Sequence, residues 1–96
     1  MINYYKKGQK VRVRCTFTVD GVPTDPTTIT CKIMDPSRNV TPYVYGTDGE
    51  LVRDGTGVYH VDVVTDETQE WNFRFEGTGI CTAVEESTFG VQTVFP

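Results

Sequence analysis

The sequence is poor in the residues that build helices and catalytic sites. Leucine occurs once, at Leu51, histidine once, at His60, and serine only at Ser37 and Ser87. Helical domains are rarely so poor in leucine, and no segment sustains a hydrophobic period of 3.6 residues. We therefore expect no helix of consequence. Threonine is abundant instead, and β-branched residues favour strands.

Long apolar runs are also absent. No stretch of about 18 apolar residues is available to span a membrane. The first ten residues, MINYYKKGQK, contain no apolar core of a signal peptide. We therefore expect a protein that stays in the cytoplasm where it is made, with no signal peptide and no membrane partner.

The three cysteines, Cys15, Cys31 and Cys81, include no C-x-x-C pair. An odd number of cysteines without a secretion signal favours buried free thiols over a disulfide framework. The missing pair argues against zinc, and no D-x-[DN]-x-[DN] run offers a calcium loop. The sequence predicts no metal site and no other cofactor.

Candidate catalytic groups are scarce. His60 and Asp62 could supply a base and its orienting carboxylate, but residues two apart on a strand share a face without facing each other. Neither serine stands in a nucleophile motif. Gly77-Thr78-Gly79 lacks the following helix and the Lys-Ser/Thr pair of a phosphate loop. We predict that the protein is not an enzyme.

What the sequence does contain is alternation of apolar and polar residues, which is typical of half-buried strands. Strands are expected at 10–19, 27–34, 40–45, 50–53, 58–65, 71–76, 80–86 and 88–95. The last two could instead be one long strand with a bulge. Seven or eight short strands predict an all-β, two-sheet antiparallel sandwich. The runs 59–63 and 71–75 are expected to form its central hairpin.

Charge is divided unevenly along the chain. Residues 1–9 have the character of an N-terminal arm with two aromatic side chains, Tyr4 and Tyr5, ahead of a sandwich over residues 10–96. These aromatics could dock on the arm's own domain or on a neighbour. The first 19 residues carry a charge of +5 and the remainder −9.

This charge division leaves three interpretations open. The basic residues could form a solvated strand face with charged edges, which discourages aggregation. They could instead dock the subunit on an acidic surface. Binding to nucleic acid is a weaker third interpretation, because the acidic remainder would repel phosphates.

Three segments occur in an order and spacing that resemble one family. The first is Asp25-Pro26-Thr27-Thr28-Ile29-Thr30 leading to Met34-Asp35-Pro36, the second is 52–62 (VRDGTGVYHVD), and the third is 71–79 (WNFRFEGTG) followed by 83–86 and 89–91. Together they resemble small immunoglobulin-like proteins that tailed bacteriophages encode, usually among head and neck genes. The likeness covers about residues 8–94. This chain departs from the pattern in having Gln69-Glu70 where a glycine often precedes the tryptophan.

The resemblance implies an immunoglobulin-like β-sandwich and a non-enzymatic structural role in the virion. We expect a capsid decoration (cement) protein that docks in many copies on the head and self-associates in a symmetric assembly. Its partners would be the major capsid or neck proteins, without nucleic acid. The alternatives are a head–tail junction component, or a surface module that binds host carbohydrate through Tyr43 and Tyr45, although packing between strands is the expected role of these two rings.

No residue-level interface follows from the resemblance, so the docking contact is predicted from charge and aromatic content. The residues expected to make it are Tyr4, Tyr5, Lys6, Lys7, Lys10, Arg12 and Arg14.

Overall fold

A computed structural model describes residues 3–93 of the 96-residue chain. The ends of the predicted arm and sandwich, residues 1–2 and 94–96, lie outside the described range. The described part is all-β, as predicted, and contains ten strands: β1 Asn3–Lys6, β2 Lys10–Thr16, β3 Thr18–Val19, β4 Val22–Pro23, β5 Thr28–Met34, β6 Val40–Val44, β7 Leu51–Gly55, β8 Val58–Val64, β9 Gln69–Thr78 and β10 Ala83–Gln92.

The prediction of seven or eight strands was too low. The arm supplies β1, and the expected strand at 10–19 divides into β2 and the short β3, which pairs with β4 across the Asp20-Gly21 turn. Conversely, the two expected strands 80–86 and 88–95 form one continuous strand, β10. The pairing of β10 with β9 runs without a register shift from Ala83 to Val91, so no bulge interrupts it.

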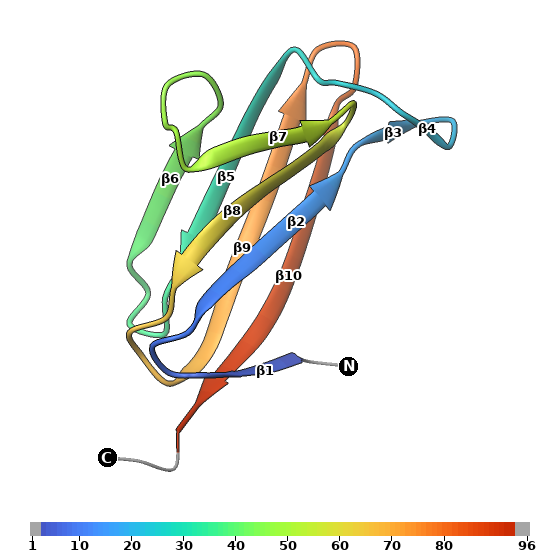
Figure 1. Ribbon diagram of the computed structural model, residues 1–96. Helices are drawn as coiled ribbons and strands as arrows, with labels where there is room; N and C mark the ends of the chain where they lie inside the picture. Colours follow the sequence, from blue (N-terminus) through green and yellow to red (C-terminus); the bar gives the residue numbers. More distant parts are fainter. Residues whose placement is uncertain (1–2, 94–96) are drawn as a thin grey trace.

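The strands form two main sheets that face each other (Figure 1). The larger sheet has the order β1-β10-β9-β5-β6, and the smaller has the order β2-β8-β7. Neighbouring strands are antiparallel except β1 and β10, which are parallel. The resulting arrangement is that of a β-sandwich.

The alternating residues meet between the two sheets as predicted for half-buried strands. Strand β2, for example, alternates exposed and buried positions along its whole length. The buried hydrophobic side chains are Val11, Val13, Cys15, Phe17, Ile29, Cys31, Ile33, Leu51, Tyr59, Val61, Val63, Trp71, Phe75, Cys81, Phe89 and Val91. Burial of this apolar surface is the main source of the fold's stability.

The predicted central hairpin was wrong. The run 59–63 lies in β8 of the smaller sheet, whereas 71–75 lies in β9 of the larger sheet. Strand β8 pairs with β2 and β7, and β9 pairs with β5 and β10. The connection between the two runs therefore crosses from one sheet to the other. Alternation shows that a strand has one buried face, but it does not identify the strand's hydrogen-bonding partner.

Asp25 ties the segment before β5 to the smaller sheet. Its Oδ1 accepts hydrogen bonds from the Gly57 backbone N–H and the Tyr59 hydroxyl, both at 2.8 Å. The Arg53 guanidinium donates to both Asp25 oxygens, at 3.2 and 2.9 Å. These donors, led by Arg53, hold the pKa of Asp25 well below its usual range. Gly57, at φ 75°, lies so close to the Phe17 carbonyl that a Cβ would be 2.6 Å from its oxygen.

Candidate docking surface

Both tyrosines of the N-terminal arm contact their own domain. Strand β1 pairs with the end of β10, from Asn3 with Phe89 to Lys6 with Gln92. Tyr5 is half-buried and meets the Phe89 ring edge to face, with the centroids 5.7 Å apart. Tyr4 is on the opposite, outer face of the sheet, against Gly90, whose missing Cβ would stand 2.5 Å from the ring. Of the two docking possibilities for the arm, the structure shows the intramolecular one.

The turn between β1 and β2 is held firmly at one end of the sandwich. The Gln9 N–H donates to the Lys6 carbonyl at 3.1 Å, and the Gly8 N–H donates to the Thr65 carbonyl at 2.6 Å. Thr65 is fully buried, and its hydroxyl donates to the Gln9 carbonyl at 2.8 Å. This turn therefore presents Lys6, Lys7 and Lys10, all exposed, at a fixed place in the fold.

The two arginines of the predicted basic face have acidic partners within their own sheet. Arg12 on β2 makes a two-pronged contact with Asp62 on β8, at 2.9 and 3.2 Å. This contact raises the pKa of Arg12 and lowers the pKa of Asp62. Arg14 Nε lies 4.0 Å from Asp54 Oδ2. Much of the positive charge that the sequence places on β2 is thus balanced across the sheet.

The distribution of ion pairs separates three lysines from most other bases. Five basic side chains lie within 4.0 Å of a carboxylate, namely Arg12, Arg14, Lys32, Arg53 and Arg74. Among residues 3–93, the bases that form no such ion pair are Lys6, Lys7, Lys10 and Arg38. Three of these four lie together where β1 leads into β2: Lys6 ends β1, Lys7 is in the turn and Lys10 begins β2. We call Lys6, Lys7 and Lys10 the lysine turn.

His60 lies on the outer face of the smaller sheet but is buried there, with a 6% exposed fraction. Its Nδ1 is 2.7 Å from Asp54 Oδ2, and its Nε2 is 4.0 Å from Asp62 Oδ2. The carboxylate closest to it is therefore Asp54 on the neighbouring strand β7, not Asp62. The irregular register between Arg53 and Gly55 lies beside this contact. The alternation of apolar and polar residues does not show that β7 and β8 are neighbours, so the contact between His60 and Asp54 could not be predicted from the sequence.

All three cysteines are free and buried. Burial raises the pKa of Cys15 and of Cys31 to about 12, so both thiols stay protonated. Within residues 3–93 no group of three or more His, Cys, Asp or Glu side chains is arranged to hold a metal ion. No helix long and apolar enough to cross a membrane occurs in the same part of the chain.

Tyr43 and Tyr45 pack and do not form a flat aromatic platform. Tyr43 is partly buried against the core and pairs with Cys31 across β5 and β6. Tyr45 meets the buried Tyr59 ring edge to face, with centroids 5.4 Å apart. Both rings thus pack as expected, although Tyr45 keeps an exposed fraction of 42%, and Tyr4 is more exposed still, at 63%.

Comparison with known proteins gives information on the fold alone. No protein-family model matches the chain, and no curated protein matches it. A solved structure of a putative glycoside hydrolase from Bacteroides vulgatus ATCC 8482 is similar, with a TM-score of 0.60 and 11% sequence identity. The match covers 94% of this chain but only 16% of that protein. The fold therefore also occurs as a small part of a much larger chain.

Proposed function

We propose that this protein is a non-enzymatic structural subunit of a tailed-phage virion that docks through the lysine turn onto an acidic surface of the particle. The observation that carries this proposal is the concentration of unpaired lysines in one rigid turn, while five of the other bases lie next to carboxylates. The sequence resemblance supports the phage setting. The favoured position is the head surface, as a decoration protein.

Such a contact is electrostatic, and its total strength comes from many copies that bind at equivalent positions. Three exposed lysines attract a patch of carboxylates at long range, and salt at physiological concentration screens this attraction beyond about 8 Å. One contact is weak, but many copies on a symmetric lattice each find an equivalent acceptor. The structure needs little rearrangement for this, because hydrogen bonds to Thr65 already fix the turn.

Docking can be measured on phage heads that lack the protein. The triple variant Lys6→Glu, Lys7→Glu and Lys10→Glu should bind at least about tenfold more weakly than the unmodified protein. Arg38→Glu is the control for the single variant Lys7→Glu, which changes the charge by the same amount and should also weaken binding. Arg38 is exposed and forms no ion pair within residues 3–93, but lies outside the turn. Equal loss of binding in the control would show a general charge effect and would count against the lysine turn.

A further inference from the structure

Three hollows lie in a row on the outer face of the five-stranded sheet. The first, of about 510 Å³, is lined by Tyr4, Thr68, Gln69, Glu70, Gly90, Val91, Gln92 and Thr93. The second, of about 540 Å³, shares Gln69 and Glu70 with it. The third, of about 170 Å³, shares Met34, Asn72 and Glu86 with the second. Adjacent hollows share residues, so together they trace one groove that follows β9 from Gln69 to Arg74.

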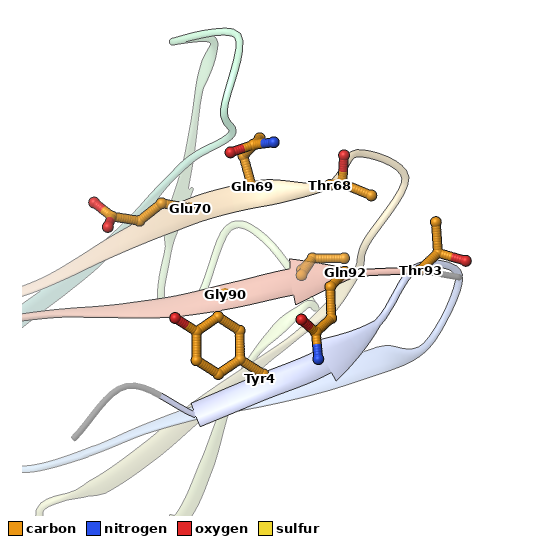
Figure 2. A pocket seen from close by; sticks show the side chains of 8 residues that line it. Tyr4, Thr68, Gln69, Glu70, Gly90, Gln92 and Thr93 are labelled. Carbon is orange, nitrogen blue, oxygen red and sulfur yellow. The ribbon is translucent and has the colours of Figure 1, made fainter. Parts of the chain in front are cut away.

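An exposed aromatic ring stands at one end of this groove. Figure 2 shows the Tyr4 ring beside Gly90, with the Gln92 side chain near it. Tyr4 is 63% exposed, although its ring rests against the backbone of β10. Gly90 permits this close approach because it has no Cβ. The ring is therefore supported on one side and open to solvent on the other, which is the arrangement that a stacking ligand requires.

Polar side chains without protein partners also line the first hollow. Within residues 3–93, the side chains of Gln69, Glu70 and Gln92 form no hydrogen bond or ion pair with the protein. Together they offer amide donors, amide acceptors and a carboxylate acceptor in the first hollow. Ligands with several hydroxyl groups, each able to donate and accept, fit such a mixed set.

The backbone at Gln69 is held in an unusual conformation. Its φ is 100°, in a region that favours glycine. A non-glycine residue there is strained, and strain of this kind is concentrated at functional sites. Gln69 lines both the first and the second hollow. The conformation places an amide side chain where the two hollows meet.

Charge along the groove is mixed and balanced, because Lys32, Arg38 and Arg74 line it together with Asp35, Glu70 and Glu86. Arg74 lies 2.6 Å from Glu76 and 3.3 Å from Glu86, and Lys32 lies 3.5 Å from Glu76. A nucleic acid would need an excess of unpaired positive charge to neutralise its phosphates. The groove therefore favours an uncharged ligand that combines apolar C–H faces with hydroxyl groups.

We propose that this groove binds a neutral oligosaccharide. One sugar ring stacks on Tyr4, and its hydroxyl groups bind Gln69, Glu70 and Gln92. The next sugars follow the groove toward Asn72 and Arg74. Glu70 and Arg74 are about 13 Å apart along β9 at the usual rise of a strand, so the groove holds more than one sugar ring. The groove runs along a sheet face, whereas the lysine turn lies at the end of the sandwich, so docking through the turn would leave most of the groove exposed.

The test uses the full chain labelled with ¹⁵N. Amide resonances are followed by NMR while cellohexaose, xylohexaose, maltohexaose, mannohexaose, chitohexaose and galactotetraose are each added to about 10 mM, well above the millimolar affinities of weak protein ligands. At least one of these sugars should shift the amides of residues 68–72 and 90–92, and its disaccharide should bind more weakly. No shift with any of the six, or shifts confined to other parts of the protein, would overturn the proposal.

Variants then locate the contact. Tyr4→Ala should weaken binding about tenfold, the loss expected for one stacked ring, whereas Tyr4→Phe should retain most of it. Tyr45→Ala removes a tyrosine outside the groove and should leave the affinity unchanged. Because Tyr4→Ala could loosen β1, Glu70→Ala provides a second variant that leaves β1 intact and should also weaken binding. Unchanged affinity in both Tyr4→Ala and Glu70→Ala would overturn the assignment.

Discussion

The Tyr59 hydroxyl donates a 2.8 Å hydrogen bond to Asp25 Oδ1, across 34 positions of the chain. Tyr59 is buried in the middle strand of the smaller sheet, and Asp25 precedes the first residue of β5 in the larger one. The contact therefore links the two sheets through a polar pair at the edge of an apolar core. Burial and the neighbouring Asp25 carboxylate together raise the pKa of Tyr59 to about 12.

Removing the Tyr59 hydroxyl should weaken this link. Tyr59→Phe keeps the ring and its edge-to-face contacts with Phe17 and Tyr45, but it deletes a hydrogen bond to a charged acceptor. We expect the free energy of unfolding to fall by about 1–2 kcal/mol. Urea unfolding followed by tryptophan fluorescence measures it. Tyr4→Phe is the matched control, because no hydrogen bond of the Tyr4 hydroxyl is found within residues 3–93. Equal losses in both variants would contradict the account.

Acid should destabilise the protein through Asp25. Its pKa is lowered in the folded state, so its contribution to stability is complete above the unfolded-state pKa of about 4. That contribution is lost as the pH falls from there toward the folded-state pKa. Asp25→Asn should therefore be less stable than the unmodified protein at pH 7, and the difference should shrink below about pH 4.

The pH dependence is measured by urea unfolding between pH 7 and pH 2.5. Asp66→Asn is the control, since Asp66 is exposed and forms no ion pair or side-chain hydrogen bond within residues 3–93. A stability difference for Asp25→Asn that stayed constant over the whole range would show that charge at this position is unimportant.

Gly90 should be needed for the position of β1. In Gly90→Ala the new Cβ would lie 2.5 Å from the Tyr4 ring, which must move away. We expect faster hydrogen exchange at the β1 amides, while the free energy of unfolding changes by less than about 1 kcal/mol. Gly49→Ala is the control, because no atom lies within 4 Å of its added Cβ. Protection of β1 equal to that of the unmodified protein would argue against the contact between Tyr4 and Gly90.

The buried thiols should resist alkylation. Cys15 and Cys31 have exposed fractions of 4% and 0%, and their pKa values are raised to about 12. Because the thiolate is the reactive form, brief treatment with iodoacetamide at pH 8 should leave both unmodified in the folded protein and modify both in urea. Peptide mass spectrometry gives the modified fraction at each site. Rapid modification of either cysteine in the folded protein would contradict the burial described above.

Alternation allowed the all-β class and most strands to be predicted from sequence. It could not show which strands pair, because Tyr59 and Trp71 carry the same pattern whether they lie in one sheet or in two. The pairing of the arm with β10 could not be predicted either. It depends on Gly90, which lies about 85 residues away in the chain and leaves room for the Tyr4 ring.

The residues predicted to dock include both paired and unpaired bases, because the sequence does not show which strands lie side by side. Positive charge can be counted in the sequence, but the register that brings Arg12 to Asp62 cannot be seen before the strands are paired. The structure separates these paired arginines from the lysine turn. The groove was missed because its residues come from five strands, the loop between β5 and β6 and the loop before β9, and only the fold brings them together.

The central claim, a structural subunit present in many copies of a virion, is tested most directly by counting copies. On the proposed phage origin, purified virions would be analysed by quantitative mass spectrometry against the major coat protein. The account predicts one copy per coat subunit or a simple fraction of that number. A ratio that matches one six- or twelve-fold ring would move the protein to the neck. Complete absence from the particle would contradict the virion role.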